Sequence, residues 1–438
     1  MKISLLALKN FKGWREVELP LGQITVLFGT NSSGKSSILQ SILLLKQTVE
    51  SFDRDRVLHF GEPHRDYVEL GDFRETVYGH NPENEMEIGI LWHLPNPLAN
   101  RSEVISDIKY NARFRLTDDH IVLWSLQYST EKLKIGIQKD LKDYRVFGND
   151  FEKKIDSQIA SPPISCYRIP PEAVKSFPSI DQYLFPHEFE KLLQCVLYLG
   201  PLRQPPERLY RWSGAGPGSL GMKGEDAVQA ILANLKYTHP DKRKPPIDIR
   251  EKVEKWMKRL GVAENVEFTP VEHNGRLYDF RITVQDDSYQ VSIADAGVGV
   301  SQLLPVIVQL YFAPRGSVLI FEQPEIHLHP SVQAALADLF IEAAEEMNHQ
   351  IIIESHSEHF LVRMQRRIAE SEMELAKKEH IRLYCFEIEN KCSYAKELNL
   401  DNYGKIENWP DNFFGDTLGD REAIMRAMIR RKAMERRS

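Results

Sequence analysis

The sequence has few cysteines and no long hydrophobic run. Its 438 residues include 4 cysteines, Cys166, Cys195, Cys385 and Cys392, which form no C-x-x-C pair and no zinc-type spacing. This pattern argues against a disulfide scaffold or a zinc module and favours a reduced, cytoplasmic setting. No stretch approaches the roughly 18 apolar residues that a membrane span needs. The charged N-terminus does not have the pattern of a signal peptide. We therefore expect a cytoplasmic protein with no membrane partner.

The sequence also lacks an excess of positive charge. Lys and Arg total 56 and Asp and Glu total 63, which gives a formal net charge of −7. Such a chain cannot coat nucleic acid uniformly, so any contact with nucleic acid requires a local basic patch. Two segments are basic enough to serve, but a charge run is more often a solvated helix face. The two segments are Lys242, Arg243, Lys244, Lys252, Lys255, Lys258 and Arg259, and the tail with Arg421, Arg426, Arg430, Arg431, Lys432, Arg436 and Arg437.

The strongest motif is a glycine-rich loop between an expected strand and an expected helix. Residues 24–28 are apolar, GTNSSGKS follows them, and residues 38–45 have helical spacing. Backbone N–H groups of such a loop, with the helix N-terminus, hold phosphate oxygens. Lys35 adds a positive charge beside the β- and γ-phosphates, and the Ser36 hydroxyl can ligate Mg²⁺. The sequence therefore predicts a nucleotide site that also uses Mg²⁺.

Two later apolar runs end in polar residues that can complete this site. Residues 318–321 precede Glu322, and residues 351–353 precede Glu354, Ser355 and His356. The helical segment between the two runs indicates a βαβ unit. A P-loop needs a carboxylate at the end of a neighbouring strand for its Mg²⁺ shell, which predicts that role for Glu322. We predict His356 as a γ-phosphate sensor; a solvated acidic turn and a structural histidine are the alternatives.

A fourth element is a glycine-rich turn that runs directly into an expected helix. Gly297, Gly299, Ser301 and Gln302 lie at this helix start. Small residues and a serine at a helix N-terminus can bind an anion. The element is weak alone, because a glycine-rich turn entering a helix is common.

The order of these elements resembles the ABC-type ATPase heads of the SMC, RecF and OLD group. More narrowly, it is similar to the AAA-15/AAA-21-type ATPases of bacterial anti-phage defence. The resemblance is thin between about residues 84 and 190, and its last segment resembles the short C-terminal domain of unknown function of that subfamily. The segments are VELGDFRETVYG (68–79), YLGPLRQPPERLY (198–210), DAGVGVSQLLP (295–305), FEQPEIHLHP (321–330), ESHSEHFLVR (354–363) and NWPDNFFGD (408–416).

The resemblance implies roles for individual positions. The Walker A loop that binds ATP comprises Gly29, Asn31, Ser33, Gly34, Lys35, Ser36 and Ser37. The signature region, which touches the nucleotide of the other subunit, comprises Gly297, Gly299, Ser301 and Gln302. Glu322 takes the Walker B place and shares Mg²⁺ with Ser36, and His356 takes the switch-histidine place. His327 and His329 fall in the following D-loop region, where packing or interface roles are favoured over a metal site.

Two departures from the family pattern affect the expected chemistry. The residue after the Walker B carboxylate is usually Glu, and here it is Gln323. An amide can orient water but cannot accept its proton at neutral pH. Either Glu325 substitutes, or hydrolysis is slow. The expected catalytic set is thus Lys35, Glu322, Gln323, Glu325 and His356. No Q-loop glutamine can be placed, since Gln40 and Gln47 lie on the helix after the P-loop.

The implied fold is an α/β P-loop NTPase of the ABC-ATPase head type, with an antiparallel β lobe and an inserted β-rich or mixed region. We expect divisions at 1–80 (Walker A), 81–195 (insertion), 196–404 (signature, Walker B and switch His) and 405–438 (C-terminal domain and basic tail).

The implied function is an ATPase that acts as a nucleotide-gated sensor or regulator in anti-phage defence. Two or more copies would share composite ATP sites. A separately encoded effector, a nuclease by expectation, would act with them, because the chain contains no Toprim-like acidic set or HNH-type cluster. A RecF- or SMC-like DNA-repair clamp and an ATP-locked binding module with little turnover are the alternatives.

Overall fold

The centre of the molecule is a six-stranded sheet of order β10-β15-β16-β3-β17-β18. The computed structural model describes residues 1–53, 56–63, 65–99, 104–140, 143–149, 152–155, 165–170, 184–236, 247–271, 276–284, 289–370, 377–409, 425 and 428. The six strands are β10 (Val196–Leu199), β15 (Val318–Glu322), β16 (Gln350–Glu354), β3 (Ile24–Gly29), β17 (Ile381–Glu389) and β18 (Cys392–Glu397). The first five run parallel, and β18 is antiparallel to β17. Parallel strands covered on both faces have continuous apolar sequences, as the runs before Gly29, Glu322 and Glu354 do.

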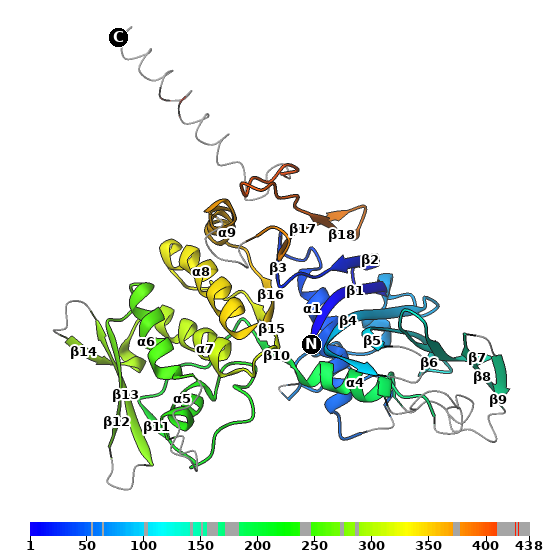
Figure 1. Cartoon of the computed structure of the whole chain (residues 1–438), viewed down its shortest axis with the longest axis horizontal. Coiled ribbons are helices and arrows are strands. Elements are labelled where there is room, and N and C mark those ends of the chain that lie inside the picture. Colours follow the sequence, from blue (N-terminus) through cyan, green and yellow to red (C-terminus); the bar gives the residue numbers. More distant parts are fainter. Residues whose placement is uncertain are drawn as a thin grey trace.

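One face of this sheet is covered by two helices and a large antiparallel sheet (Figure 1). The helices are α1 (Lys35–Glu50) and α4 (Leu184–Gln194). The second sheet has the order β2-β1-β4-β5-β6-β7-β8-β9. Its strands are β1 (Lys2–Phe11), β2 (Trp14–Pro20), β4 (Met86–Ala99), β5 (Val104–Thr117), β6 (His120–Ser129), β7 (Lys134–Asp140), β8 (Asp143–Gly148) and β9 (Glu152–Ile155). The short α2 (Phe73–Thr76) and the 3₁₀ turn η1 (Tyr78–His80) precede β4.

The β-rich segment after residue 80 continues the sheet that the N-terminal strands begin. β4 pairs with β1 over Lys2 to Lys9, and β5 to β9 follow as consecutive antiparallel pairs. Alternate residues of β5 are buried, and one of them, Tyr110, stacks on Phe189 of α4 with ring centroids 4.3 Å apart. The expected division at 80/81 stays a proposal, because the strands on either side of it share one sheet.

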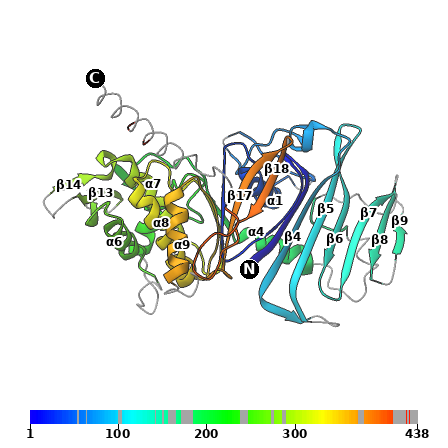
Figure 2. The same cartoon turned by 90° about the horizontal axis from the view of Figure 1, so that it is seen from above.

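The other face of the central sheet is covered by five helices and a small antiparallel sheet (Figures 1 and 2). The helices are α5 (Ala227–Leu235), α6 (Ile249–Arg259), α7 (Val298–Phe312), α8 (Pro330–Met347) and α9 (Glu358–Glu370). The small sheet has β11 (Leu209–Arg211), β13 (Leu277–Val284), β12 (Asn265–Pro270) and β14 (Tyr289–Ser292), and the turn η2 (Ile293–Asp295) leads from it to α7.

Side chains of the central strands alternate between two hydrophobic cores. Leu27, Ile320 and Ile352 belong to the core that contains α1 and the antiparallel sheet. Their chain neighbours, such as Leu319 and Ile353, belong to the core beneath α7, α8 and α9. This period of two follows from strand geometry. The expected α/β architecture with an antiparallel lobe is therefore confirmed.

The basic residues of α6 face carboxylates of the neighbouring helix α8. Lys252 Nζ lies 2.6 Å from Glu346 Oε2, and Arg259 Nη1 lies 2.9 Å from Glu342 Oε2. Lys255 also pairs with Glu342. These contacts give this basic stretch partners within the protein. Residues 242–244, the named basic residues of the tail and residues 410–416 of the last family-like segment lie outside the described residues.

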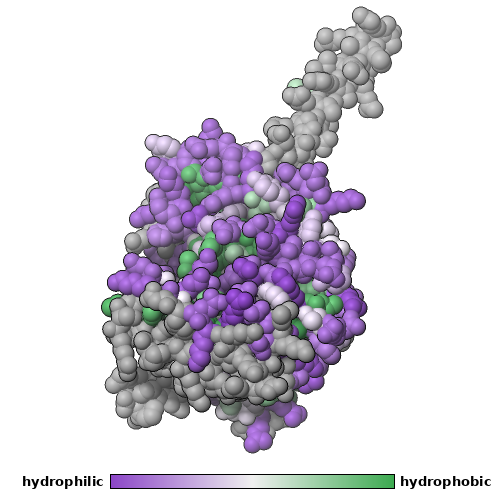
Figure 3. All heavy atoms as spheres, turned by 90° about the vertical axis from the view of Figure 1, so that its right-hand side faces the viewer, coloured by the Kyte–Doolittle hydropathy of each residue, from purple (hydrophilic) through white to green (hydrophobic). Residues whose placement is uncertain are grey.

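The outer surface of the antiparallel lobe is mainly hydrophilic. Figure 3 shows this side with extensive hydrophilic areas and a few hydrophobic patches. Among the described residues, no helix is long and apolar enough to cross a membrane.

Candidate functional site

The predicted P-loop connects the carboxyl end of β3 to the start of α1. Gly34 has φ +99°, and a Cβ there would lie 2.5 Å from Ser393 Oγ. Gly29 has φ +141°, and a Cβ there would collide with the Phe386 carbonyl. Left-handed backbone is the conformation that glycine tolerates best. Both motif glycines are therefore required by the turn itself, which directs the first N–H groups of α1 toward the loop.

The lysine of the loop is held inside it. Lys35 is 3% exposed, and its Nζ donates to the carbonyls of Gly29 (3.0 Å) and Thr30 (2.7 Å). Burial lowers the pKa of Lys35, and the nearby Glu354 opposes this shift. Asn31 is exposed, while Ser36 and Ser37 are half-buried at the helix start. The ammonium is thus placed beside the loop backbone, where phosphate oxygens would bind.

The ends of the two strands beside β3 bring two carboxylates to the same edge. Glu322 and Glu354 are register partners at the ends of β15 and β16. Tyr198 of β10 donates its hydroxyl to Glu322 Oε1 at 3.1 Å, and Ser36 Oγ donates to Glu354 Oε1 at 3.1 Å. Burial and the neighbouring Glu354 raise the pKa of Glu322 to about 7. Burial likewise raises the pKa of Glu354.

A third carboxylate joins the strand ends to the predicted switch histidine. Glu325 Oε1 accepts hydrogen bonds from Ser355 Oγ at 2.8 Å and from the His356 backbone N–H at 2.6 Å. Burial raises the pKa of Glu325. Burial and then Lys35 lower the pKa of His356, and the Gly29 backbone opposes this shift. His356 is therefore neutral at pH 7, and Glu325 fixes the turn that carries it.

A buried arginine accompanies these carboxylates. Arg203 is 6% exposed, and its Nη2 donates to the Glu322 carbonyl at 3.4 Å. Its Nε and Nη1 have no hydrogen-bond partner among the described residues. Burial lowers the pKa of Arg203 to about 10, and Tyr198, Glu322 and Glu325 oppose that shift. The guanidinium remains charged at neutral pH and offsets part of the negative charge at this edge.

Gln323 stands in a restrained turn directly after Glu322. Its φ is +43°, and its backbone N–H donates to the Glu354 carbonyl at 2.8 Å. Left-handed backbone is uncommon for a residue other than glycine and often marks a functional turn. The amide side chain is therefore presented at the same edge as the P-loop.

The signature residues lie in the other lobe. Gly297 caps the N-terminus of α7, and a Cβ on it would meet nothing within 4 Å. Ser301 is buried and donates to the Val298 carbonyl at 2.8 Å, while Gly299 and Gln302 complete the first turn. No described residue of this turn shares a hydrogen bond or ion pair with the P-loop. Figure 1 shows α7 and α1 on opposite sides of the central sheet.

The structure thus brings together Lys35, Ser36, Glu322, Glu325 and His356 and leaves the signature turn apart. His329 instead caps α8, where its ring accepts from the Ser331 backbone N–H. Within the described part of the chain, no group of three metal-ligating side chains forms, around His327 and His329 or elsewhere.

Sequence reasoning assigned no role to two members of this edge, which are Glu354 and Tyr198. For Glu354 a signal was present, since it ends an apolar strand as Glu322 does. Gln47, one of the two glutamines considered for a Q-loop, is buried and bonds the backbone of His59 and Val68.

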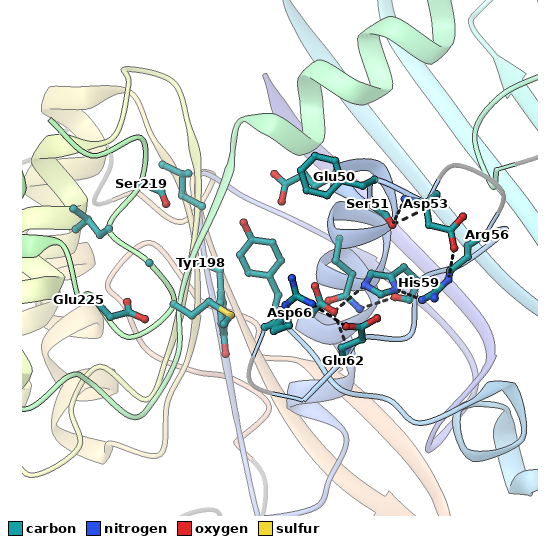
Figure 4. Close-up of a pocket in the computed structure, with 18 of the residues that line it drawn as sticks. Glu50, Ser51, Asp53, Arg56, His59, Glu62, Asp66, Tyr198, Ser219 and Glu225 are labelled. Carbon is teal, nitrogen blue, oxygen red and sulfur yellow. Dashed lines mark hydrogen bonds and ion pairs between the residues drawn. The ribbon is translucent and has the colours of Figure 1, made fainter. Parts of the chain in front are cut away.

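A cavity of about 660 Å³ lies behind Tyr198, between the segment after α1 and residues 219–225 (Figure 4). Tyr198 forms part of its wall while its hydroxyl contacts Glu322. The lining contains five carboxylates and only two arginines, Arg56 and Arg65; the carboxylates are Glu50, Asp53, Glu62, Asp66 and Glu225. Like charges repel, so this cavity does not suit the phosphates of a nucleotide, which fit the P-loop edge.

Comparisons with known proteins agree with this geometry. A family model described as "AAA domain, putative AbiEii toxin, Type IV TA system" matches residues 24–362. A second model, described as a protein of unknown function, matches residues 377–424. Together with the observed layers, the first match confirms the predicted fold class, an α/β ATPase head of ABC type with an antiparallel β lobe.

A curated relative is the OLD nuclease of Thermus scotoductus, 20% identical over 370 residues. The match covers 82% of this chain but only 59% of that protein, so the chain spans about three fifths of its relative's length.

Two solved SMC head domains each cover 91% of this chain with 12% identity. One is from Thermotoga maritima, with a TM-score of 0.40 and its whole chain covered. The other carries an extended coiled coil, is bound to the C-terminal domain of ScpA and derives from Pyrococcus furiosus; it gives a TM-score of 0.48 with 96% of its chain covered.

Proposed function

Because this chain belongs to the AAA-domain family whose model spans residues 24–362, we propose that it binds and hydrolyses ATP as a nucleotide-gated regulator. Its setting would be bacterial anti-phage defence, in the cytoplasm and with a separately encoded effector. One observation carries the ATPase part. The P-loop, the buried carboxylates of Glu325 and Glu354 and the half-buried carboxylate of Glu322 meet at one edge of the central sheet, while Gly297 of the signature turn is exposed in the other lobe.

The residues at the sheet edge fit ATP and Mg²⁺. Gly29 and Gly34 form a turn that no side chain could occupy, and α1 begins directly behind it. Such a loop presents N–H groups to phosphate oxygens. The buried oxygen Glu325 Oε2 has no donor among the described residues, as expected for an edge that receives positive charge. Ser36 and Glu322 would hold Mg²⁺, which supplies charge neutralisation at the phosphates.

The chain's own residues would act mainly by positioning and by charge. Lys35 would bind the terminal phosphates, and the His356 ring, neutral by its lowered pKa, would contact them from the end of β16. Glu325 orients His356 through its backbone N–H. Gln323 can orient a water but cannot take its proton. Since phosphoryl transfer depends chiefly on positioning and electrostatics, slow turnover without a carboxylate at position 323 is the expected behaviour.

Dimerisation would complete the site. The start of α7 has open space around Gly297 and no side-chain cap, and a helix N-terminus can bind an anion, so the phosphates of a second copy would be bound there. ATP bound between two copies would then favour the assembled state, and its hydrolysis would release that state. Such a switch can report to an effector protein.

The effector and the trigger are proposed on indirect grounds. The relative named OLD nuclease aligns with 82% of this chain, which makes nucleic acid a reasonable class of trigger or target. The sequence contains no recognisable nuclease cluster of its own. In this proposal the nuclease is a separate partner chain.

The test mixes two variants that are each inactive. Lys35→Ala removes the charge that binds phosphate, and Gly297→Asp places a carboxylate at the signature turn, where an Asp cap also keeps α7 folded. Phosphate release should vanish in each variant alone. Mixing them should restore about a quarter of wild-type turnover, because half of the dimers are mixed and each has one intact composite site. Gly297→Ala, which adds no charge, is the control and should stay active.

The wild type alone adds a second criterion. Turnover should rise more steeply than protein concentration. Turnover that is linear in concentration, with no recovery in the mixture, would mean that one chain holds a complete site. ATP binding without phosphate release, together with turnover in Gln323→Glu, would support the ATP-locked binding module instead.

A further inference from the structure

We propose that Glu354 is a ligand of Mg²⁺ in the nucleotide site, beside Ser36 and Glu322. This inference rests on the proposed ATP site and deepens it. The Walker pattern accounts for one carboxylate at the end of β15. It assigns nothing to the carboxylate at the end of β16.

The location of Glu354 is the first argument. It lies at the carboxyl end of β16, between the strand that carries Glu322 and the strand that leads into the P-loop. Its Oε1 accepts a hydrogen bond at 3.1 Å from Ser36 Oγ, the hydroxyl that the P-loop provides for Mg²⁺. An oxygen that contacts this hydroxyl is within reach of the same cation.

The second argument is an unmet need for positive charge. Glu354 is 3% exposed, and its Oε2 has no hydrogen-bond partner among the described residues. A buried carboxylate oxygen without a partner is costly. The two cations near this edge make their hydrogen bonds elsewhere, since Lys35 donates to loop carbonyls and Arg203 to the Glu322 carbonyl, and Lys35 acts on Glu354 only through its charge. Mg²⁺ binds through carboxylate oxygens, so it meets this need.

The third argument concerns the choice of residue type. If Glu354 served only to hold Ser36, a glutamine would do so without burying a charge. Gln350, at the other end of β16, is such a glutamine, because its amide forms hydrogen bonds with the backbone of Ile3. The carboxylate at 354 also lies next to Gln323, whose N–H bonds the Glu354 carbonyl. The position after Glu322 is thus an amide, Gln323, while the end of the neighbouring strand β16 carries a carboxylate, Glu354.

The test separates the charge of Glu354 from its hydrogen bond. Glu354→Gln keeps an oxygen that can accept from Ser36 but removes the negative charge. Affinity for a fluorescent ATP analogue is measured with Mg²⁺ and with EDTA. The variant should lose roughly 10- to 100-fold of the gain in affinity that Mg²⁺ gives, the range for groups that support a bound metal. Affinity in EDTA should be unchanged or higher, since a negative charge near the phosphates is gone.

Two further measurements complete the experiment. Glu18→Gln, on the exposed side of β2, removes the same charge away from the site and should behave as the wild type. Glu354→Asp keeps a carboxylate and should retain part of the Mg²⁺ gain; it also serves if Glu354→Gln does not fold. Mn²⁺ bound in the presence of ADP, counted by electron paramagnetic resonance, should fall in Glu354→Gln and persist in Glu18→Gln.

The outcomes distinguish this inference from the proposed function. A Glu354→Gln protein that retains the full Mg²⁺ gain and Mn²⁺ binding would show that Glu354 only holds Ser36, and the inference would be overturned while the ATP site stands. A wild type that binds no ATP under either condition would overturn the proposed function and this inference together.

Discussion

The parallel strands of the central sheet begin at one edge, here called the amino edge, and end at the other, the carboxyl edge, where Gly29, Glu322 and Glu354 lie. Both edges contain buried polar side chains, but of opposite kinds. At the amino edge, Gln23, His349 and Gln350 are neutral and bond backbone groups, although His349 Nδ1 has no hydrogen-bond partner among the described residues. The carboxyl edge instead contains three ionisable carboxyl groups and an arginine, and Glu354 Oε2, like two nitrogens of Arg203, has no hydrogen-bond partner among the described residues. Most polar groups that the fold alone requires are matched within the protein. Buried charges left unmatched indicate a place where a ligand binds.

This contrast predicts opposite responses to substitution. Removing a polar group from the amino edge should lower stability and leave nucleotide binding by the folded protein intact. Removing a charge from the carboxyl edge should impair the ATP site while stability holds or rises, because ionised buried groups are unfavourable without their ligand. The three predictions below test this contrast with unfolding measurements in the absence of nucleotide and Mg²⁺.

The largest effect is expected for Gln350→Leu. The Gln350 Oε1 accepts from the Ile3 N–H at 2.7 Å, and its Nε2 donates to the carbonyls of Ile3 (2.7 Å) and Gly22 (2.9 Å). Leucine would leave these three backbone groups buried and unpaired, and it should lower the free energy of unfolding by about 3–6 kcal/mol. Urea unfolding at pH 7.5 measures the change.

The matched control for that prediction is Gln365→Leu. Gln365 makes one hydrogen bond, to the Gly404 carbonyl, in a partly buried position on α9. The same substitution there should lower the free energy of unfolding by only about 1 kcal/mol. Equal losses at both positions would mean that the amino edge is not specially dependent on its amide.

His349 should make the amino edge sensitive to acid. It is fully buried, its Nε2 donates to the Leu310 carbonyl at 3.1 Å, and burial lowers its pKa to about 4. In the unfolded chain its pKa is close to 6.5. As pH falls from 6.5 to 4, His349 becomes protonated in the unfolded chain but stays neutral in the folded protein. The free energy of unfolding therefore falls in that window. The loss from this group is about 3 kcal/mol.

The variant His349→Gln isolates this contribution, because its amide can still donate to Leu310 but does not titrate. Unfolding free energies of both proteins are compared at pH 7.5, 5.5 and 4.5. The difference should shift in favour of the variant on acidification, by most of the stated amount at pH 4.5. A difference that does not change with pH would show that His349 titrates normally.

The carboxyl edge could be predicted from sequence because parallel strands buried on both faces have unbroken apolar sequences. Their polar residues therefore gather at strand ends, and Glu322, Glu325 and His356 could be located by reading where the runs after 317 and 350 stop. The P-loop was equally visible, since its glycines and Lys35 are local in sequence. The α/β class and the antiparallel lobe were implied by the family resemblance.

What the sequence could not provide is the pairing of distant segments. The contact between Ser36 and Glu354 joins residues 318 positions apart and depends on the order of strands in the sheet. Tyr198 and Arg203 reach the site only because β10 lies beside β15. For the same reason, the basic residues of α6 could be taken as a nucleic-acid patch until α8 was seen to provide their carboxylate partners.

The smallest effect, with the opposite sign, is expected for Glu325→Gln at the carboxyl edge. Burial raises the pKa of Glu325 above its usual value, so in the window between the unfolded and folded values the folded protein holds a proton that the unfolded chain has lost. Stability therefore falls as pH rises through that window, and the glutamine variant escapes this loss. At pH 8 the variant should therefore unfold with a higher free energy than the wild type. At pH 4.5 the two proteins should be nearly equal in urea unfolding.

A variant that is less stable at pH 8 than at pH 4.5, relative to the wild type, would mean that the ionised carboxylate stabilises the fold through Ser355 and the His356 N–H. Polar groups at the carboxyl edge would then stabilise the fold, as those at the amino edge are predicted to do.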